Sequence, residues 1–403
     1  MNKGLEIARG KTKVLYELPG QPEMLVVTQT DAISAGDGAR RHTIEGKGRL
    51  AAKTTARVFR LLNLCGLPTH YASGGEDDDD NEMLVRRAQM LPLEVVVRGV
   101  AAGSFVRRKP DIPRGSILVP RLIEFFLKDD AAHDPQIEFD AIVGQGIANP
   151  GELSAITEMA RMAFEILAHA WRRLDVLLVD CKFEFGRLAS GEQKGMLVLA
   201  DVIDNDSWRI WPQGREELML DKQYYRNLET VGDDDLEAVR RRYDRVAEMV
   251  GSFPVMRPGM IAVFSDGTEH NEYGDAVLRA ISQFALPVLR HVVSVERTPG
   301  YLLQLIAQLD ATYARLTYVT IGSLQSSLSR MVDASTANPV LRAAEGVDRP
   351  DDIAYACAKA FGLEDTVVFG RVMLMQATAR SAVMQLDAQL NSPPPQPPGV
   401  TIA

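Results

Sequence analysis

Three carboxylates lie on the apolar, strand-like runs of one stretch, residues 177–212, in which a polar loop joins the two runs. Asp180 and Glu184 belong to the first apolar run, and Asp201 ends the second. Side chains alternate between the two faces of a strand, so Asp180, Lys182 and Glu184 share one face. If the runs pair as a hairpin, Glu184 and Asp201 come close together, and adjacent carboxylates favour a hard divalent cation between them. A solvated strand face with ordinary charges is the alternative.

Two glycine-bearing segments near the N-terminus have residue types that bind phosphate. In the first, Gly10 would let the backbone approach a phosphate, while Lys11 and Lys13 supply ammonium groups. The second combines a hydroxyl, backbone N–H groups and a guanidinium within seven residues, with Ser34, Gly36 and Arg40. The GxxxxGK[ST] pattern of a P-loop is absent. An exposed turn with solvated lysines and a flexible surface loop are the respective alternatives.

Charged side chains also interrupt an apolar strand-like run further along the chain. Glu94 and Arg98 lie inside the sequence LEVVVRGV. Charges in a buried strand need partners, so both residues are candidates for a site. The following residues, 101–104, predict a tight turn that would present the Ser104 hydroxyl and backbone N–H groups.

Two further charged groups complete the set of candidate residues. Lys128 and Asp134 follow an apolar run, near His133, which is more typical of a structural hydrogen bonder than of a base. Lys222 and Arg226 are one helical turn apart and could together hold a carboxylate. An ordinary charged helix start is the alternative for this last pair.

The elements that must position these residues follow from hydrophobic spacing and turn residues. Residues 5–30 predict a β-hairpin or meander, and residues 83–108 predict two β-runs joined at 90–92. Helical spacing of apolar residues predicts helices over 49–66, over 151–173, and from 233 to about 251.

A change of pattern near residue 260 divides the chain. Residues 251–259 have the Pro and Gly content of a linker between an N-terminal domain, 1–250, and a second domain, 260–392. In the second domain strands alternate with helices, which predicts a small parallel α/β fold of three layers. The Pro-rich tail, 393–403, is expected to be extended. The fold class is therefore α/β, with an α+β first domain.

Composition excludes several classes of partner. The 403 residues carry a net charge of −9, which gives no basic field for nucleic acid or an anionic membrane. Three widely spaced cysteines indicate reduced thiols and no zinc site. The first residues lack the apolar core of a signal peptide, and no apolar run reaches membrane-spanning length. We expect a cytoplasmic protein with small anionic ligands.

Seven blocks, taken in order over residues 4–248, resemble the SAICAR synthetase family (phosphoribosylaminoimidazole-succinocarboxamide synthase). The blocks are RGKTKVLYE, SAGDGAR, LPLEVVVRGVAAGSFVRR, FFLKDDAAHDP, LLVDCKFEFG, LADVIDNDSWRIWP and DKQYYR. Each block alone has little specificity, whereas the ordered set is highly specific. The last two are most similar to the bifunctional animal-type enzymes, in which the synthetase is fused to an aminoimidazole ribonucleotide (AIR) carboxylase.

The resemblance implies an ADP-forming carbon–nitrogen ligase that binds ATP, Mg²⁺, L-aspartate and an aminoimidazole carboxylate ribonucleotide. ATP would convert the carboxylate into an acyl phosphate, which the aspartate amine attacks. The implied ATP-binding residues are Gly10, Lys11, Lys13 and Glu94, and the implied metal ligands are Glu184 and Asp201. The implied reacting centre has Lys128, Asp134 and Lys182. The implied substrate-binding residues are Ser34, Gly36, Arg40, Arg98, Ser104, Asp180, Arg209, Lys222 and Arg226.

The second domain resembles the AIR carboxylase in a degraded form. The family's Ser-Ala-His-Arg-Thr-Pro motif is here SVERTP, residues 294–299, with Glu296 in place of the histidine. A carboxylate cannot do the same proton transfer at the same pH without a large pKa shift. The glycine-rich nucleotide loop is replaced by residues 322–327, GSLQSS. We therefore expect a retained fold without carboxylase activity, and a role in homo-oligomer assembly in which the apolar stripe of the final helix packs against a partner.

Two other functions remain open at this point. One is an amide ligase that acts on another azole carboxylate nucleotide, for instance in nucleoside antibiotic synthesis, because a degraded second domain is unexpected in a housekeeping fusion. The other is a non-catalytic nucleotide-binding scaffold. The intact pair Glu184 and Asp201 favours catalysis over the scaffold.

Overall fold

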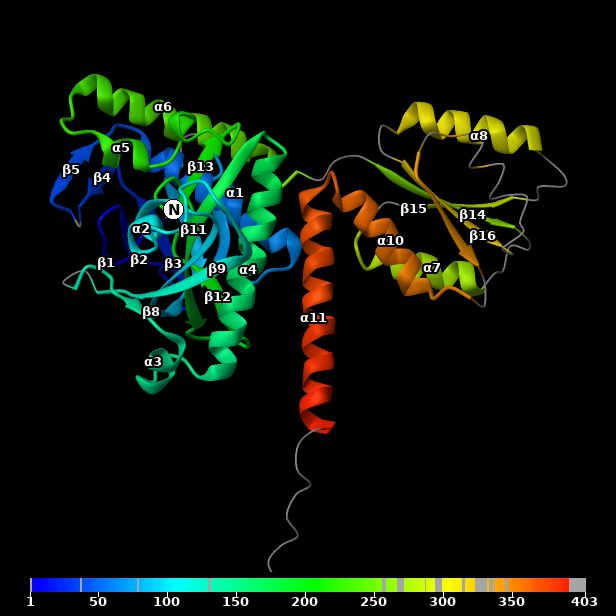
Figure 1. Ribbon diagram of the computed structural model, residues 1–403, viewed down its shortest axis with the longest axis horizontal. Coiled ribbons are helices and arrows are strands. Elements are labelled where there is room, and N and C mark those ends of the chain that lie inside the picture. The colour runs from blue at the N-terminus through cyan, green and yellow to red at the C-terminus, as the bar shows by residue number, and fades with distance from the viewer. Residues whose placement is uncertain are drawn as a thin grey trace, which may run out of the picture.

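The structure is a computed structural model that describes residues 2–36, 38–77, 80–129, 132–255, 259–266, 272–286, 288–293, 299–313, 316–322, 332, 336, 338–344 and 347–390. Figure 1 shows an N-terminal body and a smaller C-terminal body on either side of the long helix α11 (Thr366–Leu390). Within the described residues, no helix has the length and apolar character needed to cross a membrane.

The first sheet of the N-terminal body is antiparallel and contains the predicted N-terminal meander. Its strand order is β1 (Glu6–Arg9), β2 (Lys13–Glu17), β3 (Met24–Gln29), β7 (Glu82–Arg86) and β6 (Tyr71–Gly74). Helix α1 (Lys47–Cys65), at the predicted position, packs on this sheet. A separate two-stranded ribbon contains β4 (Ala32–Ala35) and β5 (Arg40–Thr43).

The second sheet is built around the stretch that carries the three carboxylates. Its strands are β10 (Gln136–Ile137), β9 (Ile117–Leu127), β8 (Ala88–Val100), β11 (Val176–Leu188), β12 (Leu197–Ala200) and β13 (Trp208–Pro212). The predicted hairpin is present, because β12 pairs antiparallel with β11 and Glu184 faces Ala200. β13 pairs with the first half of β11, and β8 pairs along its other edge, so β11 is a central strand.

Helix α4 (Pro150–Arg172) covers the apolar face of this sheet, as its spacing predicts. The Asn149 side chain accepts a hydrogen bond from the Glu152 backbone N–H, and Glu152 accepts one from the Asn149 N–H, which closes a capping box. Trp171 is fully buried against Trp208 and Phe253. The apolar side chains of β11 thus face the core, which leaves its charged side chains on the opposite face.

One predicted boundary was wrong. The two β-runs of residues 83–108 meet at Arg87, between β7 and β8, rather than at 90–92. Pro92 lies inside β8, at an irregularity in its pairing with β11. Proline has no N–H to donate, and such irregularities are where a sheet accepts it. The predicted turn at 101–104 leads into a short helix, α2 (Gly103–Arg108).

The C-terminal body is a parallel sheet covered on both faces, as predicted. Its strand order is β15 (Val288–Val293), β14 (Met260–Asp266), β16 (Leu316–Gly322) and β17 (Val340–Ala344). One face packs on α7 (Glu272–Ser282) and α10 (Pro350–Gly362), and the other on α8 (Pro299–Thr312). Glu296, most of the segments 294–299 and 322–327, and the tail 393–403 lie outside the described residues.

Helix α11 ties the two bodies together through its first half. The Arg371 guanidinium donates hydrogen bonds to the Leu64 carbonyl, at 3.0 Å, and to the Phe284 carbonyl, at 2.8 Å. Val367 and Ala377 belong to the N-terminal core. The apolar surface that was expected to meet a partner is therefore covered within the chain over this half. Further along, Val383 and Met384 are exposed.

The remaining elements are short or lie at the surface. They are α3 (Phe139–Gly144), α5 (Gln223–Asn227), α6 (Asp233–Met249), and the single-turn helices η2 (Glu216–Leu218) and η3 (Val250–Ser252). Helix α6 is at the predicted position and packs on α1.

Candidate active site

A cavity of about 200 Å³ lies over the charged face of the second sheet and is lined by eight of the eighteen predicted residues. Its lining comes from strands β8, β9, β11 and β13, helices α2 and α5, and the loops beside them: Glu94, Val96, Arg98, Ser104, Phe126, Asp134, Asp180, Lys182, Asp206, Ser207, Trp208, Arg209 and Arg226. Residues from distant parts of the sequence therefore meet in one polar pocket.

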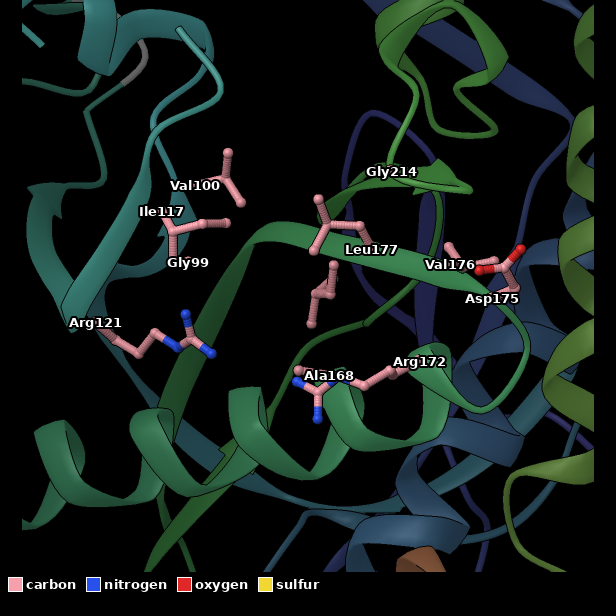
Figure 2. Close-up of a pocket in the computed structure, with 11 residues that line it drawn as sticks. Gly99, Val100, Ile117, Arg121, Ala168, Arg172, Asp175, Val176, Leu177 and Gly214 are labelled. Carbon is pink, nitrogen blue, oxygen red and sulfur yellow. The ribbon is translucent and has the colours of Figure 1, made fainter. Parts of the chain in front are cut away.

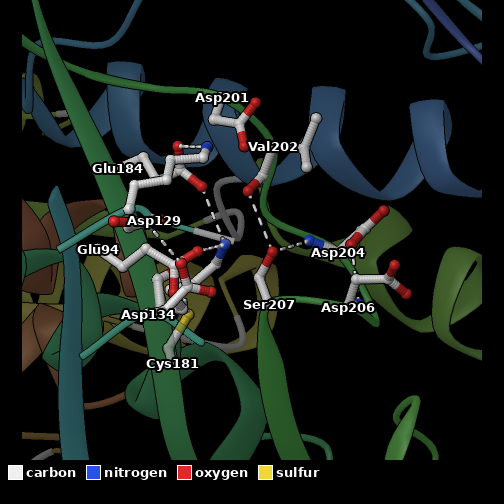
Figure 3. A network of polar contacts seen from close by, with 12 residues as sticks. Glu94, Asp129, Asp134, Cys181, Glu184, Asp201, Val202, Asp204, Asp206 and Ser207 are labelled. Carbon is white, nitrogen blue, oxygen red and sulfur yellow. Dashed lines mark hydrogen bonds and ion pairs between the residues drawn. The ribbon is translucent and has the colours of Figure 1, made fainter. Parts of the chain in front are cut away.

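Lys182 is the central cation of this pocket. Its Nζ lies 2.7 Å from Glu94 Oε1 and 2.9 Å from Glu184 Oε1, and Lys128 Nζ lies 2.6 Å from Glu184 Oε2. Figure 3 shows the Glu94 and Glu184 side chains within this network of polar contacts. Burial lowers the pKa of Lys182, but the carboxylates of Glu184 and Glu94 outweigh it and hold that pKa above its usual value. Burial raises the pKa of Glu184, but Lys182, Lys128 and Lys13 bring it down to about 2. Both groups stay charged at neutral pH.

The second predicted metal ligand, Asp201, forms an ion pair with Lys13 from β2. Asp201 directly follows Ala200, the residue opposite Glu184, and so lies just beyond the end of the β11–β12 ladder. The Asp201 backbone is left-handed, with φ of 64°, and its carbonyl lies 3.1 Å from His70 Nε2. Burial lowers the pKa of Lys13 to about 8. Lys13 thus joins the first sheet to the metal-binding candidates of the second.

A buried arginine network forms the far wall of the pocket. Arg98, which is 3% exposed, donates to Glu124 Oε2 at 2.5 Å and to Asp180 Oδ2 at 2.8 Å. Asp180 also accepts from Arg209. A buried arginine needs partners for its charge, and for Arg98 these partners are Glu124 and Asp180. Asp180 holds both guanidinium groups in place, and Arg209 is the more exposed of the two.

Because Gly103 has no side chain, the Arg209 guanidinium can lie directly against its backbone. Its φ is +56°, and a Cβ built there would overlap the Arg209 guanidinium. The conformation and the close approach both require glycine at this position. The segment before Ser104 therefore shapes the cationic wall as well as presenting the hydroxyl.

A buried acidic cluster beside the pocket was missed by the sequence reasoning. Asp206 accepts from Lys222 Nζ at 2.7 Å and from the Tyr243 hydroxyl, and Lys47 Nζ lies 5.1 Å from the centre of the Tyr243 ring. Lys222 and Lys47 hold the pKa of Asp206 below its usual value against the effect of burial, whereas burial and Asp206 raise that of Asp204 to about 6. The run Asp-Asn-Asp, residues 204–206, was the available signal.

The structure separates the predicted pair Lys222 and Arg226. Lys222 is buried on Asp206, whereas Arg226 is exposed and lines the pocket. Arg40 is also bound within the fold. Its guanidinium donates hydrogen bonds to the Tyr225 and Leu228 carbonyls at 2.5 Å and lies over the Tyr225 ring. Arg40 thereby fixes α5, the helix that carries Arg226.

Most of the other predicted residues lie on strands and turns that do not line the pocket. Ser34 is buried in β4, and Gly36 has a φ of 58° in the turn after it. The Gly10 N–H donates to the Lys13 carbonyl in the tight β1–β2 turn, which places Lys11 at the tip. Asp134 Oδ1 accepts from the Asp129 N–H at 2.9 Å, which closes the loop after β9.

A different cavity, of about 290 Å³, lies where α4 ends beside the second sheet (Figure 2). Arg121, Arg172 and Asp175 line it together with apolar side chains such as Leu177. None of the predicted site residues lines this cavity. It is therefore separate from the candidate active site.

The depressed pKa of Glu184 predicts an acid-labile contribution to stability. Its pKa is about 2 in the fold against an ordinary 4.5, so the contribution is complete above pH 4.5 and is lost as pH falls toward 2. Glu184→Gln should therefore lower the free energy of unfolding by about 3 kcal/mol at pH 7 and by less than half of that at pH 3. Denaturant unfolding of both proteins at the two pH values measures this. An equal difference at both would contradict the ionic role of Glu184.

An α+β fold with a polar pocket of lysines, arginines and carboxylates defines a protein that binds several anionic groups together. The sequence profile of SAICAR synthetase matches residues 6–246, and the chain belongs to the SAICAR synthetase family, a family of ligases in purine biosynthesis. This confirms the family indicated by the seven sequence blocks.

Relatives cover both parts of the chain. The phosphoribosylaminoimidazole-succinocarboxamide synthase of Roseiflexus castenholzii is 52% identical over 247 residues, which are 61% of this chain and 96% of that protein. The bifunctional carboxylase/synthetase of Drosophila melanogaster is 34% identical over 344 residues, 84% of this chain and 79% of that protein. A solved SAICAR synthetase in complex with ADP is 32% identical and has a TM-score of 0.53, over 61% of this chain and 97% of that one.

Proposed function

We propose that the pocket joins L-aspartate to the carboxylate of carboxyaminoimidazole ribonucleotide. ATP would phosphorylate that carboxylate, and the aspartate amine would displace phosphate from the acyl phosphate, giving SAICAR, ADP and phosphate. The observation that carries the proposal is the Lys182 network, in which one cation lies between Glu94 and Glu184 in a pocket lined by further cations. Phosphoryl transfer needs such fixed positive charge around the reacting oxygens.

The nucleotide is proposed to bind between the two sheets. The relative solved with ADP supports a nucleotide site in this fold. Gly10, Lys11 and Lys13 would lie over the phosphates, because the tight β1–β2 turn presents backbone and ammonium groups at one place. Glu94, half-buried beside Lys182, would bind on the nucleotide side of the reacting centre.

Glu184 and Asp201 would hold Mg²⁺. Proteins commonly bind this ion through one or two carboxylates, with substrate phosphates and waters as the other ligands, and adjacent carboxylates on β11 and after β12 fit that pattern. Among the described residues there is no group of three or more acidic, histidine or cysteine side chains that would form a complete protein site. The ion would neutralise charge on the ATP phosphates. Lys13 and Lys128, now on these carboxylates, would then contact phosphate oxygens.

The ribonucleotide phosphate is proposed to bind Arg209 and Ser104, with Asp180 and Arg98 as the groups that hold Arg209 in position. Ser34, Gly36 and Arg40 would extend the substrate site at the β4–β5 ribbon. Arg226 would bind an aspartate carboxylate, and Lys222 would act with it by way of Asp206.

The reacting carboxylate would lie near Lys182, Lys128 and Asp134. The two ammonium groups would balance negative charge that develops as the carboxylate attacks the phosphate. Asp134 lines the same pocket and would accept a proton from the attacking aspartate amine.

Incubation of the purified chain with ATP, Mg²⁺, L-aspartate and carboxyaminoimidazole ribonucleotide tests the function. We expect SAICAR and ADP in equal amounts, measured by chromatography. ADP release only with a different azole carboxylate nucleotide would assign the chain to another ligase reaction. Absence of ADP release with every azole tested would support a scaffold instead.

The C-terminal body is proposed to serve assembly rather than carboxylation. The replacement of the family's histidine by Glu296 supports the loss of carboxylase activity. The exposed Val383 and Met384 on α11 support contact with a second copy. Light scattering should give a mass above 44.4 kDa, the mass of one chain, and carbon dioxide exchange into aminoimidazole ribonucleotide should be absent. A monomer would contradict the proposed role in assembly, and measurable exchange would contradict the proposed loss of carboxylase activity.

Gly103→Ala should weaken ribonucleotide binding. The added Cβ would overlap the Arg209 guanidinium and force a left-handed backbone on alanine, so Arg209 would leave its position. We expect the KM for the ribonucleotide to rise by about tenfold or more, with the KM for ATP little changed. Steady-state kinetics with each substrate varied in turn measures both. Gly191→Ala, at a glycine with open space around it, is the matched control. Equal changes in both KM values would contradict a local role.

A further inference from the structure

A cavity of about 510 Å³ lies at the junction of the two bodies, outside the candidate active site. The last turns of α4 and α10 and the first turns of α11 form its walls, and in Figure 1 α11 lies between α4 of the N-terminal body and α10 of the C-terminal body. Among the residues that the structure describes, no acidic side chain lines it. A pocket of this size, shared by two bodies, can hold a small organic molecule.

The inner wall of this junction cavity is apolar and aromatic. The His169 and Phe369 rings stack with centroids 4.4 Å apart and planes at 14°. His169 Nδ1 lies 2.9 Å from the Thr366 hydroxyl, and burial lowers the pKa of His169, so its ring is neutral at neutral pH. Met373 continues the apolar wall, and Leu363, which is 77% exposed, forms part of the rim. This surface suits a flat apolar group.

The cavity also has basic side chains from both bodies. Arg172 comes from α4 and Lys359 from α10. Within the part of the chain that the structure describes, neither side chain has a hydrogen bond or an ion pair with a protein group, and Arg172 also lines the 290 Å³ cavity. Arg173 adds a third basic residue to the lining. Positive charge beside an apolar wall, with no acidic lining residue, is complementary to an amphipathic anion.

We propose that the junction cavity is a binding site for a flat aromatic anion, with its ring against the His169–Phe369 wall and its carboxylate or phosphate near Arg172 and Lys359. Such a ligand would contact the N-terminal body through α4 and the C-terminal body through α10. The site is separate from the ligase pocket, whose lining residues it does not share.

Fluorescence titration of the full chain with anilinonaphthalene sulfonate, an aromatic anion, tests the proposal. ATP is left out, because a nucleotide is itself an aromatic anion that the junction cavity would bind, and the variants at the junction report the probe that is bound there. We expect the double variant Arg172→Glu with Lys359→Glu to raise the Kd of the probe by about tenfold or more. Leu363→Gln, at an exposed position, should also weaken binding because it removes apolar contact. Lys194→Glu, at an exposed lysine of the β11–β12 loop, is the matched charge control and should leave the Kd unchanged.

Displacement of the probe then separates the possible sources of the anion. Release by AMP assigns the site to a nucleotide, and release by benzoate but not by AMP assigns it to a smaller aromatic acid. An unchanged Kd in the double variant, or a Kd that rises equally in the Lys194→Glu control, would overturn the proposal. Failure of both AMP and benzoate to release the probe would overturn it as well.

Discussion

Lys182→Met should lower kcat of the ligase reaction by about a thousandfold. Lys182 Nζ lies between Glu94 and Glu184 and lines the pocket, so its removal leaves two carboxylates facing each other beside anionic substrates. The ammonium group is proposed to balance charge that develops as the substrate carboxylate attacks ATP. We therefore expect the loss in kcat to exceed any rise in KM, which is measurable by steady-state kinetics.

Two comparisons make this experiment specific. Lys182→Arg keeps the positive charge and should recover part of the activity, although the larger guanidinium cannot take the same position. Lys194→Met, at an exposed lysine of the following loop, should have kcat close to that of the natural chain. The account of the reacting centre would be wrong if Lys182→Met kept more than a tenth of the natural kcat.

Asp201→Asn should raise the Mg²⁺ concentration needed for half-maximal activity by about tenfold or more. Asp201 is proposed to share the ion with Glu184, and an amide oxygen is a weaker ligand for a hard cation than a carboxylate. The same change releases Lys13 from its ion pair. Because burial already lowers the pKa of Lys13 to about 8, loss of this partner should move the pH dependence of activity toward lower pH.

The matched control is Glu192→Gln, which removes one exposed carboxylate from the β11–β12 loop. It should leave the Mg²⁺ dependence unchanged. An Asp201→Asn enzyme with the natural Mg²⁺ dependence would show that this carboxylate serves only Lys13. Activity titrations with Mg²⁺ at constant ATP distinguish the two outcomes.

Strand periodicity predicted the arrangement of β11 well, for a simple physical reason. A period of two places Asp180, Lys182 and Glu184 on one face, and the apolar residues between them pack under α4. The burial of Arg98 likewise predicted that it has partners. Which partners these are, Glu124 and Asp180, depends on strand register, and register is set by pairing between distant segments.

The cluster around Asp206 could not be predicted in the same way. Lys47, Asp206 and Tyr243 come from α1, a loop after β12, and α6, and only the packing of α6 on α1 brings them together. The spacing of Lys222 and Arg226 indicated one shared ligand, whereas Lys222 is buried on Asp206 and Arg226 reaches the pocket. Spacing along a helix does not specify which neighbour compensates a buried charge.

For the final helix, too, the sequence did not specify the packing partner. Its apolar residues predicted that it packs against something, and they do not say what. In the structure the first half of α11 covers the N-terminal core, with Arg371 bound to carbonyls of both bodies. The aligned length of the Drosophila bifunctional relative, 84% of this chain, extends well beyond the synthetase match and is consistent with a fused second body.

The transfer of an oxygen atom tests the central claim most directly. If the pocket forms an acyl phosphate, a ribonucleotide that carries oxygen-18 at both oxygens of its carboxylate must pass one labelled oxygen to the phosphate released with ADP. Mass spectrometry of that phosphate, after a reaction with L-aspartate and ATP, measures the label. We expect one oxygen-18 atom in each phosphate released. Unlabelled phosphate, with SAICAR still formed, would contradict the proposed mechanism.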